Sequence, residues 1–145
     1  MRNRDLGVAS ILLLAIVVIS FVIANDSFGI FRAAVPTTPK VTWRDPSGNI
    51  ISSVTLTVSS SAGAVQSIAF TCSPSAGAIE LGLTSSLSGT ISLSRTSFPT
   101  CDSSPDSVTL TASWNNDLPR SGTLQVTQPE NYRTLASLSI SVMQS

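Results

Sequence analysis

The feature that most constrains this chain is an uninterrupted apolar stretch near its N-terminus, which runs from Leu6 to Ala24. It contains no charged residue and no proline, and its only non-apolar members are Gly7, Ser10 and Ser20. An amphipathic helix would show an apolar stripe of period 3.6, whereas this stretch is apolar on every side and needs lipid or other apolar helices around it. As a helix of about 19 residues it would be roughly 28 Å long, about the thickness of a bilayer core. The sequence therefore predicts one continuous helix over about 6–30 that can span a membrane.

Three interpretations of this stretch are open: its flanks and length allow two, and a resemblance to a known family adds the third. Arg2 and Arg4 precede it, which favours a cytoplasmic N-terminus and export of everything after the stretch. A cleaved secretory signal is the first interpretation, because Val22-Ile23-Ala24 suits the processing enzyme, although the usual apolar core of about 7 to 15 residues is shorter. The second is a permanent signal anchor that holds one small domain at the cell surface. The third is a filament subunit whose apolar helix packs against copies of itself.

Charge and composition narrow the chemistry of the chain. Its 145 residues include 8 Lys and Arg, 8 Asp and Glu, and no His. No cationic field is available for phosphates, so we expect no nucleic-acid partner. Without His, we expect no metal site, no cofactor and no Ser-His-Asp or Cys-His catalysis. Only paired-carboxylate chemistry stays open, and the carboxylates after the apolar stretch and its linker are Asp45, Glu80, Asp102, Asp106, Asp117 and Glu130. All but Glu80 have the neighbours of turn residues, so we predict that the chain is no enzyme.

The remainder of the chain has the pattern of a β domain. Pro36 and Pro39 exclude a helix over 32–40 and predict an extended linker there. From Val41 onward, aliphatic residues alternate with Ser and Thr between Gly, Pro and Asn turn signals. We expect strands at roughly 41–44, 50–58, 64–72, 79–83, 90–96, 107–114, 122–128 and 132–142. Seven or eight short strands are typical of an immunoglobulin-like antiparallel sandwich. Trp43 and Trp114 are expected in the core or against the linker.

The two cysteines, Cys72 and Cys101, are predicted to form a disulfide. Their number is even, and the apolar N-terminus indicates export to an oxidising compartment. A bridge between them would stabilise the domain by roughly 3.5 kcal/mol on the chain-entropy account. Their spacing is not Cys-x-x-Cys, which argues against a redox-active pair.

The layout of a short charged leader, a glycine, an apolar helix and a small Ser/Thr-rich β domain resembles the type IV pilin superfamily, and archaeal type IV pilins most closely. The resemblance implies a leader over residues 1–7, with the leader peptidase cutting between Gly7 and Val8. Bacterial members commonly carry a glutamate at the position of Leu12. This chain has no glutamate there, and in this respect it resembles the archaeal branch. The resemblance further implies membrane insertion before assembly, an assembly machinery and a homo-oligomeric helical filament. Packing of the bundled helices would then use Leu12, Leu13, Ile16, Ile19 and Ile23.

We therefore expect an α+β fold class: residues 1–7 as leader, 8–31 as hydrophobic helix, 32–40 as linker and 41–145 as β-sandwich head domain. The expected function is that of a structural subunit of an extracellular pilus filament, serving adhesion or surface attachment. Two alternatives stay open, a signal-anchored monomeric surface domain and a secreted subunit that donates a strand to its neighbour. O-linked glycans are expected partners near Pro36-Thr37-Thr38 and Ser103-Ser104-Pro105, whereas the sequon Asn25-Asp26-Ser27 is expected to be unmodified.

Overall fold

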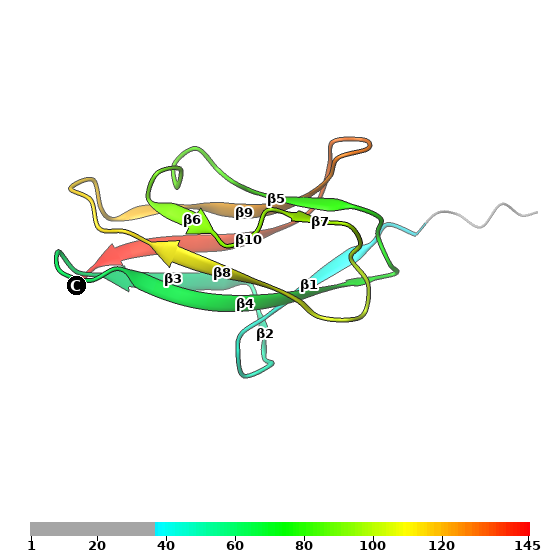
Figure 1. Cartoon of the computed structure of the whole chain (residues 1–145), viewed down its shortest axis with the longest axis horizontal. Helices are drawn as coiled ribbons and strands as arrows, with labels where there is room; N and C mark the ends of the chain where they lie inside the picture. Colours follow the sequence, from blue (N-terminus) through cyan, green and yellow to red (C-terminus); the bar gives the residue numbers. More distant parts are fainter. Residues whose placement is uncertain (1–36) are drawn as a thin grey trace, which may run out of the picture. The chain divides into compact units, whose positions relative to one another are not determined.

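A computed structural model describes residues 37–145, and two five-stranded β-sheets lying one on the other make up this part of the chain (Figure 1). In order across the first sheet the strands are β2 (Ile50–Ile51), β1 (Lys40–Arg44), β4 (Ala64–Ser73), β8 (Asp106–Ala112) and β6 (Ile91–Leu93). In order across the second sheet they are β3 (Ser53–Val58), β10 (Arg133–Gln144), β9 (Arg120–Gln128), β5 (Ile79–Leu83) and β7 (Ser97–Phe98).

The period-two alternation of the sequence decides which side of each strand is buried. In β3, Val54, Leu56 and Val58 are buried while the residues between them are exposed, because successive side chains of a strand point to opposite faces. The neighbouring β10 follows the same rule with Leu138, Ile140 and Val142. The two inner faces therefore meet as an aliphatic core, and each fully buried aliphatic side chain stabilises the fold by about 1.5–3 kcal/mol.

A chain of three aromatic rings completes the core at one end. Trp43 packs edge-on against Phe70 with ring centres 5.5 Å apart, and Phe70 packs edge-on against Phe98 at 5.0 Å. All three side chains are buried, and Trp114 is partly buried against the same core. Trp43 thus has the core position expected from the sequence, whereas Trp114 is only partly buried beside the core.

The expected α+β fold class is wrong, because the described residues are all-β and contain no helix. The helix predicted over 8–31 lies outside the described residues. No helix within residues 37–145 is long and apolar enough to cross a bilayer.

The expected wholly antiparallel sandwich of seven or eight strands is also wrong. The described residues form ten strands, and β3 runs parallel to β10. The range 50–58, expected as one strand, divides at Ser52, where the chain leaves β2 in the first sheet and enters β3 in the second. The two strands of the parallel pair, β3 and β10, are far apart in the sequence. No local turn signal could therefore indicate their relative direction.

Candidate functional site

The residues that the sequence proposes for filament assembly all lie outside the described residues. They are the leader-peptidase site at Gly7 and Val8 and the helix contacts Leu12, Leu13, Ile16, Ile19 and Ile23. Each stays a prediction, as does the unmodified state of the sequon at Asn25.

The disulfide expected from the sequence is present between Cys72, in β4, and Cys101, in the segment before β8. The two Cα atoms are 5.4 Å apart, and both side chains are fully buried. Backbone hydrogen bonds surround the bridge: the Cys72 amide donates to the Asp102 carbonyl at 2.7 Å, and Cys101 exchanges two bonds with Ala76. A buried bridge held in this way is a structural element, since redox-active cysteines need access to solvent.

The acidic side chains of the described residues were candidates for metal binding or for paired-carboxylate chemistry. No group of three Asp, Glu or Cys side chains within residues 37–145 is arranged to hold a metal ion. Asp117 forms an ion pair with Arg120, three residues later in the sequence, at an oxygen-to-nitrogen distance of 2.8 Å.

The turn after β1 contains Asp45, whose carboxyl has a lowered pKa. The side-chain amide of Asn49 donates to its carboxylate at 3.0 Å, and the Asn49 backbone amide donates at 2.9 Å. These two hydrogen bonds hold the pKa of the Asp45 carboxyl below its ordinary value, and the bond from the Asn49 side chain has the larger effect. Gly48 closes the turn with a φ of 86°, a conformation that glycine adopts without strain.

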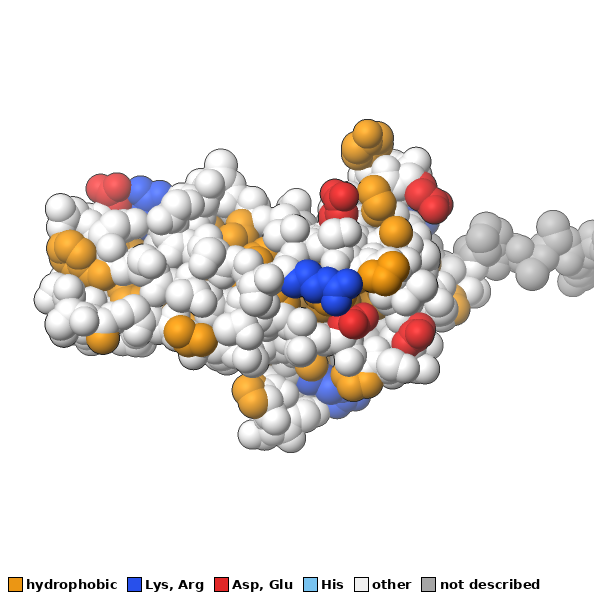
Figure 2. Space-filling model, viewed as in Figure 1, with side chains coloured by type: hydrophobic (Ala, Val, Ile, Leu, Met, Phe, Trp, Pro, Cys, Tyr) orange, Lys and Arg blue, Asp and Glu red, His pale blue; other side chains and the backbone are white. Residues whose placement is uncertain are grey.

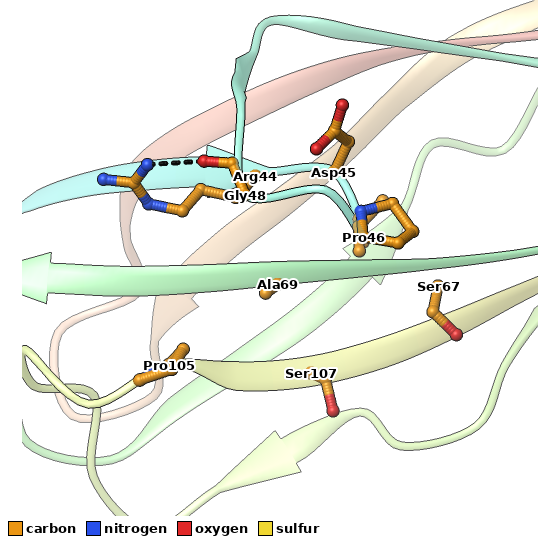
Figure 3. A pocket seen from close by; sticks show the side chains of 9 residues that line it. Arg44, Asp45, Pro46, Gly48, Ser67, Ala69, Pro105 and Ser107 are labelled. Carbon is orange, nitrogen blue, oxygen red and sulfur yellow. Dashed lines mark hydrogen bonds between the residues drawn. The ribbon is translucent and has the colours of Figure 1, made fainter.

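This turn leans over the outer face of the first sheet and forms a pocket of about 320 Å³ with it (Figure 3). Side chains and backbone from the turn, β4 and the start of β8 line the pocket: Arg44, Asp45, Pro46, Gly48, Ser67, Ile68, Ala69, Pro105 and Ser107. The Arg44 guanidinium is already bound, because its Nη1 donates to the Gly48 carbonyl at 2.7 Å. With Arg44 and Asp45 both satisfied inside the turn, the pocket offers a ligand mainly apolar contact.

The larger candidate is a surface, the outer face of the second sheet, where hydroxyl side chains lie in rows across the strands. Ser53, Ser139 and Thr123 occupy one row, as direct neighbours on β3, β10 and β9. The next row consists of Thr55, Ser141 and Ser121. We call these six residues the hydroxyl face.

The hydroxyl face is neutral and continues to the free side of β3. On the side of the molecule that Figure 2 shows, uncharged side chains cover most of the surface around several Lys, Arg, Asp and Glu. Such a surface can offer many hydrogen bonds but little electrostatic attraction, so it suits contact with another neutral polar surface. Sequence analysis found the alternation that creates the hydroxyl face but not its rows, because rows depend on which strands become neighbours.

The serines expected to carry O-linked glycans are accessible to a modifying enzyme. Ser103 and Ser104 are exposed in the segment between Cys101 and β8. The Ser104 backbone amide donates to the Asp102 carboxylate at 2.6 Å, so the two serines lie in a local turn at the surface. Glycosylation there stays a prediction.

No protein-family model and no curated protein matches this chain. Among solved structures, the chain is similar to a crystal structure of a protein of unknown function from Porphyromonas gingivalis W83, with 16% identity and a TM-score of 0.49. The similarity covers 74% of this chain and 48% of that protein, so the chain spans about half the length of its structural neighbour.

Proposed function

We propose that this chain is a structural subunit of an extracellular filament of the type IV pilin kind, with the β domain on the outside and the apolar N-terminal stretch in the filament core. The observation that carries the proposal is the contrast between the two parts of one chain. Leu6–Ala24 has no charge in its sequence, while Thr37–Ser145 folds as a unit with its own core and disulfide. A stretch of that composition leaves lipid only if similar stretches replace the lipid around it.

The β domain supports a location outside the cell. Its buried disulfide suits an oxidising compartment, and its surface is polar through Ser and Thr rather than through charge.

We propose adhesion or surface attachment as the role of the filament. Along a filament the hydroxyl face would be repeated at every subunit, and many weak hydrogen-bonding contacts add up when they are displayed together. The same neutral surface would accept contacts over a wide range of salt concentration, because screening acts on charges.

The experiment compares one substitution at two positions in the full chain. Ile16→Asp introduces a carboxylate into the apolar stretch, and an unpaired buried carboxylate costs several kcal/mol at every subunit. Ile50→Asp makes the same chemical change at a side chain that is 70% exposed on the β domain. We expect electron micrographs of native assemblies to show filaments for the parent and the Ile50→Asp chain and none for the Ile16→Asp chain.

The outcomes separate this function from its alternatives. Filaments from the Ile16→Asp chain would contradict the proposal, because the stretch would then lie outside the core. Parent protein that stays monomeric at the surface would favour a signal-anchored domain. Filaments from a chain that lacks residues 1–24 would favour the secreted, strand-donating subunit. Protection of the buried disulfide from a mild reductant, read out by alkylation in each variant, controls for folding of the β domain.

A further inference from the structure

The four edges of the two sheets are unequal in length, and one of them stands out. β2 and β7 have two residues each and β6 has three, whereas β3 has six and pairs only with β10. An edge strand presents unpaired backbone groups, which can pair with a strand of another chain. The free side of β3 is therefore the longest pairing surface at the ends of the two sheets.

The hydrogen bonds to β10 determine which β3 backbone groups are free. The Ser139 amide donates to the Ser52 carbonyl at 3.2 Å, and the Ser145 amide donates to the Val58 carbonyl at 3.0 Å. Even-numbered residues thus face β10, and by the two-residue repeat of a strand Ser53, Thr55 and Thr57 direct their amides and carbonyls to the free side.

Three other edges in the described chain have a device that protects them. At β7, the Arg95 side chain lies 4.4 Å over the Phe98 ring, and its Nε donates to the Ser97 carbonyl at 2.7 Å. At β6, the Ile91 amide is bound to the Leu87 carbonyl of the preceding loop. The part of β1 that β2 leaves uncovered carries Lys40 directly after a proline. Charges, prolines and covering loops are the usual means of preventing edge pairing.

Within residues 37–145, the strand β3 itself carries neither a charged side chain nor a proline. Between Asp45 and Glu80 the sequence contains no charged residue, and β3 itself contains no proline. Its pairing with β10 continues without a bulge from Ser53 to Val58. The edge is thus long, regular and neutral, and its core-facing side chains are fixed by burial.

We propose that β3 pairs in antiparallel fashion with β3 of a second copy of this chain, about a two-fold axis at Thr55. The sequence of β3 supports a second copy of the chain as the partner of this edge, because residues at equal distances on either side of Thr55 have the same chemical character. Reversal places Ser53 opposite Thr57, Val54 opposite Leu56, and Thr55 opposite itself. Two copies pair hydroxyl with hydroxyl and aliphatic with aliphatic, and no like charges oppose each other.

The pairing would create about six backbone hydrogen bonds, two for each of the three outward-facing residues. It would also join the hydroxyl faces of the two copies into one surface. A two-fold contact closes on itself, so it links two β domains and does not extend a filament. It therefore acts beside the proposed filament contact, as a lateral link between subunits or filaments.

The test is position-specific cross-linking in the full chain, purified in detergent, with the native disulfide intact. In the paired arrangement the Cα atoms at Thr55 in the two copies lie about 5.5 Å apart, within the range of a disulfide. Under mild oxidation we expect Thr55→Cys to give a covalent dimer on a non-reducing gel. The matched control is Thr111→Cys, since Thr111 is exposed but lies between Val65 of β4 and Ser92 of β6.

The register is tested by mixing two variants. A mixture of the Ser53→Cys and Thr57→Cys chains should form a mixed dimer, while neither variant alone should, because each residue lies opposite the other in antiparallel pairing. When Thr55→Pro is added to both the Ser53→Cys chain and the Thr57→Cys chain, oxidation of their mixture should no longer give the mixed dimer. The Thr55 amide faces the free edge, so proline removes a donor to the second copy and none to β10.

Equal yields from Thr55→Cys and Thr111→Cys would overturn the proposal, as would a Ser53→Cys chain that cross-links to itself. Electron microscopy of native assemblies of the same variants, prepared without detergent, reports separately on the proposed function. Filaments without the Thr55→Cys dimer would refute only the β3 pairing, and dimers without filaments would refute only the filament.

Discussion

Gly63 lies so close to Ala112 that a Cβ atom built on it would be 2.6 Å from the Ala112 carbonyl oxygen. The two residues meet where β4 begins beside the end of β8, and Ala64 is already paired with Ala112. Only a residue without a side chain allows the chain to enter β4 at this distance. The glycine therefore helps to set the register of the central pair of strands in the first sheet.

The first prediction concerns this contact. Gly63→Ala should destabilise the domain by about 1–3 kcal/mol, because the opposing atom belongs to the backbone and moves only with the strand. Gly82→Ala is the matched control, since nothing lies within 4 Å of the added atom and its φ is not positive. Chemical denaturation followed by tryptophan fluorescence measures both. Equal stability of the two variants would show that β4 and β8 can separate without cost.

A second prediction concerns the aromatic end of the core. Phe70 is fully buried between Trp43 and Phe98, so Phe70→Ala should destabilise the domain by about 3–5 kcal/mol. Val65→Ala truncates a side chain on the same strand that is 69% exposed, and it should change stability by no more than about 0.5 kcal/mol. The free energies of unfolding of the two variants, compared with the parent, check the prediction. A loss at Phe70 as small as that at Val65 would contradict the core described here.

The sequence predicted those parts of the fold that depend on neighbouring residues. Alternation in Val54-Thr55-Leu56 gave the buried side of β3, and Cys72 and Cys101 indicated their own bridge. These features follow from local periodicity and from chemistry that a single residue type carries.

The parts that failed depend on contacts between distant segments. The sequence could not indicate that the chain changes sheets at Ser52, or that β3 then runs beside the last strand in the same direction. β7 was missed because a two-residue strand has no period to detect. The open edge of β3 had a visible sign, the charge-free range from Pro46 to Ile79, but its meaning required the strand order.

A third prediction follows from the Asp45 turn and concerns pH. Hydrogen bonds from Asn49 lower the pKa of Asp45 in the folded domain below its ordinary value of 3.8. A carboxyl with a lowered folded-state pKa contributes stability that is fully present above the unfolded value and is lost as the pH falls through the folded value. The contribution should therefore be present at neutral pH and disappear at acid pH, below about 4.

Asp45→Asn keeps one of the two oxygens that accept from Asn49 and removes the titration. Unfolding midpoints between about pH 2.5 and pH 6 should therefore fall less steeply with acid in this variant than in the parent. Glu80→Gln, which removes an exposed carboxylate on β5, should leave the difference intact. Parallel curves for the parent and the Asp45→Asn chain would show that the turn contributes nothing to acid sensitivity.

The last prediction concerns the bridge between Cys72 and Cys101, which are 29 positions apart in the sequence. Replacing both by Ala should lower the stability by roughly 3.5 kcal/mol, because the unfolded chain regains the freedom that the closed loop denied it. For a domain of about 110 residues each kcal/mol corresponds to roughly 4–8 °C in Tm, so the melting point should fall by about 15–25 °C. A reductant should lower the Tm of the parent to a similar value and leave the double variant unchanged. Mass measurement after alkylation of the folded parent, without reductant, supplies the direct check. No label should be incorporated until the bridge is reduced, whereas two labelled thiols in folded protein would refute the bridge and remove the main support for a location outside the cell.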